Sequence, residues 1–364
     1  MTRIIRIVLI LALALLASCS GGSDKPLDID EPEQGESGGE ETGGGEEEPP
    51  VIVDTIFRIA TYNLLVNDGR RTEMTLDKCR DALGKALADC KADIFCFTEL
   101  DATFASGLSS IANGAGVTGY EWHITYPNKV LDAPDYLLEY YFANGIAFDP
   151  KKFSYLDGGM YWYLYSGKLA SKKTDAKGNH VPKYCNLVWA ELRHIPTGKK
   201  IYVVSTHLPL ASDGTPDYSA GRAHYRSAQG LNSFLDKVSY PCIMGGDLNA
   251  TPESGDQNIS GYSKLCEKWK DVYDALREEG TLDSYYLTYP GTMSGSSAKY
   301  YYTTQVYTKN HPERRYDHIM YINRSDYSVV PKKYSTVLRT YSVSGQQFCP
   351  SDHLPVVAEF AIRL

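Results

Sequence analysis

The sequence lacks several features that would assign it to a class at once. It contains no CxxC pair, which argues against a zinc ribbon. Its N-terminal apolar run, residues 7–16, is too short to cross a bilayer as a helix. No internal repeat is visible at the level of residues. These absences leave a globular domain behind a short apolar leader as the simplest interpretation.

The folded part of the chain also lacks an excess of positive charge. Eleven of the 45 acidic residues lie between Asp24 and Glu48, and three of the 37 basic residues precede residue 51, so residues 51–364 hold 34 of each. This neutral balance argues against tight nonspecific binding to nucleic acid, which needs a basic face, but it does not exclude a nuclease. The apolar fraction of 43% is ample for a hydrophobic core.

Residues 1–18 have the pattern of an export signal. Arg3 and Arg6 precede the apolar run, and Leu16-Ala17-Ser18-Cys19 ends the segment. This stretch resembles a bacterial lipobox, which implies that Cys19 is the lipidated first residue of the mature chain. The resemblance implies a protein held on a membrane of the bacterial cell envelope by a lipid anchor, on the periplasmic or the outer side. An ordinary secretory signal or a short anchor is the alternative.

Residues 19–50 contain Gly, Glu, Asp, Ser and Pro with almost no apolar residues. Such a segment cannot bury enough surface to offset its ordering entropy, so we predict a disordered acidic linker. Residues 51–364 are predicted to form the folded domain. Its seven cysteines, an odd number, leave at least one free thiol, and several lie in apolar runs typical of a core.

Hydrophobic periodicity predicts strands and helices in alternation along the domain. Strands are expected over residues 56–65, 92–100, 144–150, 187–194, 201–205, 242–246, 316–321 and 356–362, and helices within 72–89, 220–238 and 262–279. Residues 120–141 and 281–315 are expected to be loops. The strand–helix–strand order at the start indicates an α/β layer. Arg222, His224 and Arg226 lie near a helix start, where a solvent-exposed face is the main expectation and contact with phosphate is the alternative.

Five of the predicted strands end in a polar residue suited to metal binding or acid–base chemistry, namely Asn63, Glu99, His207, Asp247 with Asn249, and His353. Asp247 and Asn249 are two residues apart, so both should point the same way as their strand ends. The preceding Gly245-Gly246 leaves room for a ligand or another backbone. A buried acid such as Glu99 is costly unless it is paired or bound to a metal.

In this order, the segments TYNL, FTEL, THL, GGDLN, YDHI and SDHLP, between residues 61 and 355, resemble the endonuclease/exonuclease/phosphatase superfamily. This is the group of pancreatic deoxyribonuclease, neutral sphingomyelinases and inositol-polyphosphate 5-phosphatases. The resemblance implies a four-layer α/β/β/α sandwich of two packed mixed β-sheets with the site at one edge. It also implies a metal-dependent hydrolase, expected to be monomeric, of a nucleic acid, a phospholipid headgroup, or a sugar or inositol phosphate.

The same resemblance assigns a metal site. Glu99, helped by Asn63, would hold Mg²⁺, with Mn²⁺ or Ca²⁺ as alternatives, because hard cations prefer oxygen ligands. Asp352 is expected near the metal, although it is adjacent to His353 and neighbouring residues of a strand face opposite ways.

It assigns acid–base roles as well. His353 would be the general base, with Asp317 fixing its tautomer, and His207 would protonate the leaving oxygen or stabilise its charge. Asp247 and Asn249 would orient water and phosphoryl oxygens. Asp247 as the base is an alternative that the sequence does not decide.

Two further points stay open. Glu139 and Asn144 are both candidates for the residue that orients His207. A catalytically inactive surface module that binds glycan or nucleic acid on the same fold is the alternative function, although inactive members usually lose a histidine or the metal glutamate. Metal-dependent phosphodiester hydrolysis would separate the two functions.

Overall fold

The computed structural model describes residues 55–64, 76–100, 102–125, 143–164, 166–170, 186–209, 220–250, 252, 259–283, 315–337, 339, 341–343, 346–348, 350–351 and 353–364. It divides the chain into Met1–Val51 and Ile52–Leu364, and the architecture below is that of the second unit. The predicted signal and linker, residues 1–50, lie outside the described residues. Among the described helices, none has the length and apolar character needed to cross a membrane.

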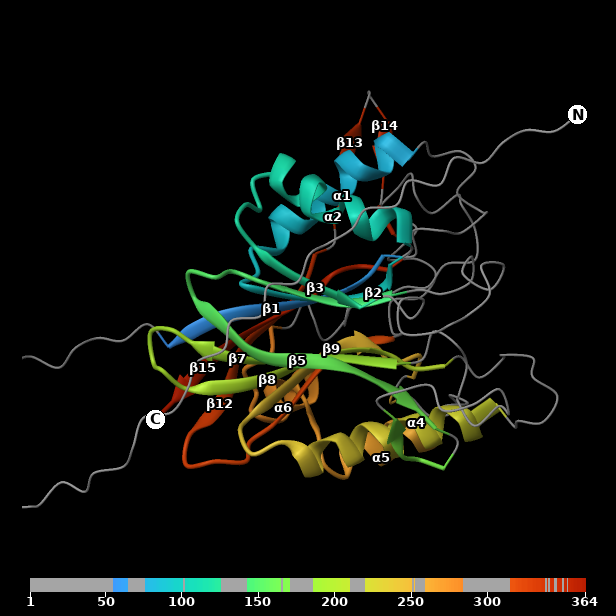
Figure 1. The fold of residues 1–364 in the computed structure, drawn as a ribbon, viewed down its shortest axis with the longest axis vertical. Helices are drawn as coiled ribbons and strands as arrows, with labels where there is room; N and C mark the ends of the chain where they lie inside the picture. The colour runs from blue at the N-terminus through green and yellow to red at the C-terminus, as the bar shows by residue number, and fades with distance from the viewer. Residues whose placement is uncertain are drawn as a thin grey trace, which may run out of the picture. The chain divides into compact units, whose positions relative to one another are not determined.

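Two β-sheets pack face to face with helices on their outer faces (Figure 1). One sheet contains, in spatial order, β12 (Ser328–Thr336), β15 (Val356–Arg363), β1 (Ile56–Asn63), β2 (Ile94–Leu100), β4 (Ala143–Phe148) and β3 (Glu121–Thr125). The other contains β10 (Lys270–Asp271), β11 (Asp317–Ile322), β9 (Cys242–Asp247), β8 (Lys200–His207), β7 (Asn186–His194), β5 (Phe153–Tyr163) and β6 (Leu169–Ala170). A separate hairpin joins β13 (Tyr341–Val343) and β14 (Gln346–Phe348).

The helices complete the four layers. Helices α1 (Leu76–Cys90) and α2 (Ala102–Gly114) cover the six-stranded sheet, while α4 (Ala220–Phe234) and α5 (Ile259–Cys266) cover the seven-stranded one (Figure 1). A short 3₁₀ turn, Leu235–Lys237, follows α4. Helix α6 (Val272–Glu278) contributes to the core between the sheets. The α/β/β/α sandwich of two packed mixed sheets is therefore confirmed.

Both faces of the central strands are buried, which explains their continuous apolar runs. In β2, Ile94 and Cys96 enter the core between the sheets, whereas Phe95 and Phe97 pack in the cluster beneath the helices. This alternation follows from the period-2 geometry of a strand. Cys90, Cys96 and Cys242 are buried free thiols, as expected for cysteines in apolar runs.

Each sheet contains one parallel pair of strands, β1–β2 in one and β8–β9 in the other. A parallel pair needs a long crossover, and here α1 and α4 lie in those connections. The carboxyl ends of both pairs lie at one edge of the sandwich, where the sheets meet. This topology brings Asn63, Glu99, His207 and Asp247 to one place.

Gly246 lies where β9 runs closely beside β8. A Cβ there would meet the carbonyl group of Thr206 well inside 3.0 Å, a limit that real Cβ atoms essentially never cross. The expectation that the glycine pair makes room for another backbone is confirmed at this position.

The expected loop over residues 120–141 is wrong at its start, because Glu121–Thr125 forms edge strand β3 against β4. The segment is short, and its pairing is supported by a stack of Trp122 on Phe97, whose ring centroids are 5.8 Å apart. The segment 262–279, expected to hold a helix, holds α6 and most of α5, separated by the short strand β10. Of the expected loop over 281–315, residues 284–314 lie outside the described residues.

Candidate active site

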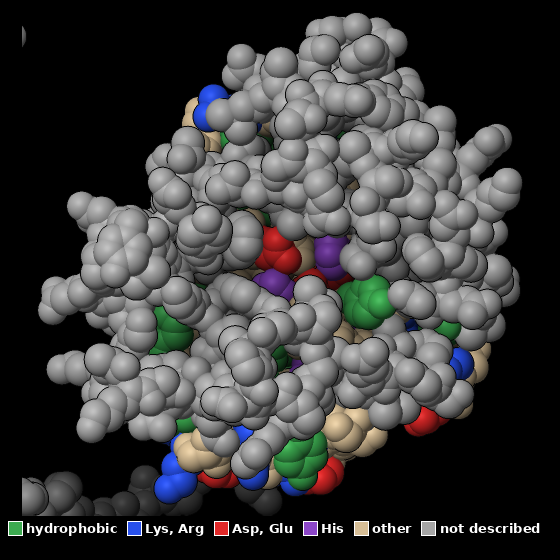
Figure 2. Space-filling view, turned by 90° about the vertical axis from the view of Figure 1, so that its right-hand side faces the viewer, with side chains coloured by type: hydrophobic (Ala, Val, Ile, Leu, Met, Phe, Trp, Pro, Cys, Tyr) green, Lys and Arg blue, Asp and Glu red, His purple; other side chains and the backbone are tan. Residues whose placement is uncertain are grey.

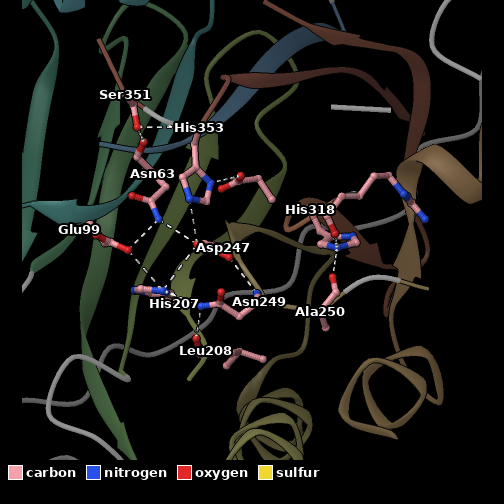
Figure 3. A network of polar contacts seen from close by, with 12 residues as sticks. Asn63, Glu99, His207, Leu208, Asp247, Asn249, Ala250, His318, Ser351 and His353 are labelled. Carbon is pink, nitrogen blue, oxygen red and sulfur yellow. Dashed lines mark hydrogen bonds and ion pairs between the residues drawn. The ribbon is translucent and has the colours of Figure 1, made fainter. Parts of the chain in front are cut away.

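Acidic and histidine side chains are seen together on one face of the molecule (Figure 2). The polar residues at the strand ends form one network of contacts there (Figure 3). Asn63, His207, Asp247, Asn249, Asp317 and His353 are each at most 8% exposed. Burial of this many polar and charged groups demands partners for each of them.

Asn63 bridges two carboxylates. Its Nδ2 donates to Glu99 Oε1 at 2.9 Å and to Asp247 Oδ2 at 2.8 Å. The amide oxygen therefore points away from these carboxylate oxygens, and the amide must rotate before Asn63 can offer that oxygen to an ion beside Glu99. The structure places Asn63 and Glu99 together as predicted, with the amide nitrogen between the acids.

His207 lies at the centre of the cluster. Its Nε2 is 3.8 Å from Glu99 Oε1 and 3.6 Å from Asp247 Oδ2. Asn249 Nδ2 lies 2.9 Å from the same nitrogen and donates to the carbonyl of Leu208 at 2.8 Å. Because a carbonyl only accepts, the orientation of the Asn249 amide is settled, and in this arrangement His207 Nε2 is an acceptor.

Asp317 and His353 form the predicted pair. His353 Nδ1 lies 2.7 Å from Asp317 Oδ2, and its Nε2 faces Asp247 Oδ2 at 3.7 Å. Burial, the largest cause, and the charge of Asp247 raise the pKa of Asp317 to about 6, although His353 acts in the opposite direction. Ser351 holds the segment in place, since its hydroxyl donates to the carbonyl of Asn63 and accepts from the backbone N–H of His353.

Two site residues have left-handed backbone conformations. The φ angle is +54° at Glu99 and +46° at Asn249. Non-glycine residues keep such conformations only where surrounding contacts over-determine them, and these positions cluster at functional sites. Glu99 is the penultimate residue of β2, and Asn249 lies two residues after the end of β9.

The donor set fits a hard divalent cation. Glu99 and Asp247 supply carboxylate oxygens, and the ligand atoms of Glu99, His207 and Asp247 lie within 4.8 Å of one another. A second such group, Asp247, Asp317 and His353, shares Asp247. Within the part of the chain that is described, no Lys or Arg pairs with Glu99 or Asp247. This concentration of uncompensated negative charge suits Mg²⁺ and related ions.

Three of the predicted positions cannot be located in the network. Asp352, Glu139 and Cys19 lie outside the described residues. Asn144 is described, and its amide nitrogen donates to the carbonyl and side-chain oxygens of Asn186. The residue that orients His207 therefore stays undecided between the two candidates.

Sequence reasoning missed a buried charged network behind the site, made by Tyr262, Asp271, Asp274, Arg315 and His318. Asp271 Oδ2 accepts from Tyr262, Arg315 and His318 at 2.7–3.1 Å. Burial alone would raise the pKa of Asp271, but Arg315 and His318 outweigh it and hold the pKa well below its usual range. The sequence did contain one sign of this network. His318 follows Asp317 on a strand, so its side chain must point to the opposite face from the site and needs polar partners there.

His224 was expected on a helix start that could meet phosphate, and this expectation is wrong. Its side chain is fully buried, with Nε2 2.6 Å from the carbonyl oxygen of Leu248. His224 lies on the inner face of α4. The helical periodicity of the sequence did not show whether this histidine faces the core or the solvent.

Comparison with known proteins agrees with the fold. The model of the endonuclease/exonuclease/phosphatase family matches residues 60–353. A mannosyl-6-phosphatase of Bacteroides thetaiotaomicron VPI-5482 shares the fold, with a TM-score of 0.58, 18% identity, and coverage of 84% of this chain and 99% of that chain.

Two further solved structures share the fold. A second B. thetaiotaomicron protein of the same family has a TM-score of 0.59 and 18% identity over 85% of this chain and 98% of its own. The human Nocturnin catalytic domain, with bound sulfate, has a TM-score of 0.53 and 16% identity. The match covers 85% of this chain and 95% of the Nocturnin domain. A search of curated protein sequences finds no relative.

Proposed function

The chain belongs to the endonuclease/exonuclease/phosphatase family, and from this premise we propose that it is a divalent-metal-dependent hydrolase of phosphoester bonds. The single observation that carries the proposal is the cluster of half-buried Glu99 with buried Asp247, Asp317, His207 and His353 near the carboxyl ends of both parallel pairs. It combines oxygen ligands for a cation with two histidines for proton transfer.

Glu99 and Asp247 would hold the metal, with the Asn63 amide as a further ligand after rotation of its side chain. A bound Mg²⁺ would offset the negative charge that builds on the phosphate. The Asp352 carboxylate is a further candidate for this site from its place in the SDHLP segment.

His353 would take a proton from the attacking water at Nε2. Asp317 accepts from Nδ1 at 2.7 Å, which fixes the tautomer and stabilises the imidazolium that results. Asp247 faces the same Nε2 at 3.7 Å, close enough to orient the water between them or to act as the base in its place.

His207 would serve the leaving oxygen. Its Nε2 accepts from Asn249 in the structure, so donation to a leaving group requires either a protonated ring or the other tautomer. Asn249 would then turn its amide toward phosphoryl oxygen.

The test is hydrolysis of bis(p-nitrophenyl) phosphate and p-nitrophenyl phosphate by the full-length protein, with and without Mg²⁺. Glu99→Gln should lower turnover by orders of magnitude and weaken Mg²⁺ binding, measured by calorimetry, by more than the roughly 10–100-fold typical of a lost outer-shell partner. Glu267→Gln, an exposed acid paired only with Lys264 among the described residues, is the matched control and should behave as wild type.

Equal Mg²⁺ affinity in wild type and Glu99→Gln would remove Glu99 from the metal site. A wild-type protein that hydrolyses neither substrate, or hydrolyses them equally after chelation, would reject the metal-dependent hydrolase. We also propose, from the lipobox-like segment alone, that Cys19 anchors this activity to the cell envelope.

A further inference from the structure

The turn that follows β9, residues Leu248 to Ala250, is held by two buried histidines that the proposed mechanism does not use. His224 comes from α4 and His318 from β11, and they are 0% and 2% exposed. His224 contacts the carbonyl of Leu248, and His318 contacts the carbonyl of Ala250, a contact that Figure 3 shows. These two residues precede and follow Asn249, whose side-chain amide faces His207.

The backbone carbonyls that the two histidines contact show that Nε2 of each ring is protonated. His224 Nε2 lies 2.6 Å from the Leu248 carbonyl oxygen, and His318 Nε2 lies 2.9 Å from that of Ala250. A carbonyl only accepts hydrogen bonds, so both nitrogens carry a proton. His318 Nε2 is also 2.9 Å from the Arg315 carbonyl, which ties the turn to the start of β11.

The turn needs such support because Asn249 has a φ angle of +46°. Asn tolerates this region better than most residues, yet the conformation persists only where neighbouring contacts fix it. The Leu248 carbonyl belongs to the peptide group directly before Asn249, and the Ala250 carbonyl lies one peptide group beyond it, so the two contacts restrict the turn around Asn249. The side chain then presents one amide proton to Leu208 and the other to His207.

Each histidine is itself fixed from behind. A Cβ built on Gly261 of α5 would lie 2.6 Å from His224 Cε1 and still closer to Nδ1, so only glycine leaves room for the ring. His318 Nδ1 lies 2.7 Å from Asp271 Oδ2, within the charged network described above. Helix α5 therefore restricts the His224 ring, and Asp271 restricts the His318 ring, so both side chains are held against the turn.

We infer that His224 and His318 are positioning residues that clamp the Leu248–Ala250 turn and thereby aim the Asn249 amide at His207 and the phosphoryl group. This inference rests on the proposed hydrolase function. It extends the site to two histidines that touch neither substrate nor metal.

If the clamp exists, removal of the hydrogen-bond donor at position 224 should lower kcat, and a different side chain with a donor should recover it. His224→Phe keeps the ring volume without the donor and should lower kcat for bis(p-nitrophenyl) phosphate by about 10–100-fold, because misplacement by an ångström costs that order. His224→Gln can donate to the same carbonyl and should recover most of kcat. KM and the melting temperature of His224→Gln should stay near wild type. His318→Phe should resemble His224→Phe.

Alanine substitutions at two glycines away from the site distinguish an effect on the clamp from a general loss of stability. Gly261→Ala pushes on the His224 ring from α5 and should lower kcat as His224→Phe does. Gly107→Ala, in α2, is the control, because a Cβ there meets nothing within 4 Å. Should either replacement at 224 or 261 prevent folding, the other still tests the clamp.

A second measurement needs no substrate. In the full-length protein labelled with ¹⁵N-asparagine, the side-chain amide signal of Asn249 is identified by its loss in Asn249→Ser. It should shift in His224→Phe and Gly261→Ala and stay in place in His224→Gln and Gly107→Ala. An unmoved signal in the first two variants, or a shift equally large in His224→Gln, would overturn the clamp. Failure of wild-type turnover would reject the hydrolase and leave this second result to decide the clamp.

Discussion

Gly246→Ala gives a direct test of how the two parallel strands position the site. In the structure, Gly246 of β9 pairs in register with Thr206 of β8, one residue before Asp247 and His207 pair. The Cβ of alanine would lie 2.9 Å from the Thr206 carbonyl carbon and nearer still to its oxygen. These are backbone atoms, so no side-chain rotation relieves the overlap.

Ordinary contact begins at 3.4 Å, so the two backbones must separate by about 1 Å next to the site. Overpacking of this kind costs about 1–3 kcal/mol and should lower Tm by several degrees. The same movement separates His207 from Asp247 and Asn249, and a 1 Å misplacement costs on the order of 10²-fold in rate.

The assay compares kcat with bis(p-nitrophenyl) phosphate at 25 °C, where both proteins are folded, with Tm from circular dichroism. Gly114→Ala is the control, since a Cβ there meets nothing within 4 Å. If Gly246→Ala keeps wild-type Tm and kcat, the close approach of β8 and β9 does not set the site geometry, and the reasoning fails.

The remaining predictions concern the proton pair, the charged network and the anchor. His353→Ala should lower kcat by about 10²–10⁴-fold. Because the pair acts as a unit, the double variant with Asp317→Asn should have a kcat little lower than His353→Ala alone. Additive decreases in kcat would instead assign the base role to Asp247. Asp271, whose folded pKa is depressed, stabilises the fold above its unfolded pKa of about 3.9 and loses this contribution as the pH falls. Urea unfolding should therefore show a steeper acid loss in wild type than in Asp271→Asn, and equal slopes would contradict it. Cys19→Ser should move the protein from membranes to the soluble fraction or leave unprocessed precursor, whereas unchanged partitioning would rule out lipidation.

The local patterns of the sequence were sufficient for the main strands and helices, and the four layers of the fold were predicted from the resemblance to a family. The expected strands that end in Asn63, Glu99 and Asp247 correspond to β1, β2 and β9, because apolar runs and strand ends are local properties of the chain. Short elements were beyond this reasoning. β3 and β10 are strands only because a neighbouring strand supplies their hydrogen bonds. A segment of two to five residues shows too little hydrophobic periodicity to predict a strand.

The sequence alone determined which residue types stand at the strand ends and in which order, and that was enough to predict a phosphoester site. Only the tertiary structure decided how they meet. The Asn63 amide lies between Glu99 and Asp247, 184 residues from the latter, and His318 points away from the site toward Ala250 while its neighbour Asp317 points into it. These contacts depend on the packing of two sheets and on room left by Gly261 and Gly246, and no local pattern of residues encodes distances across such an interface.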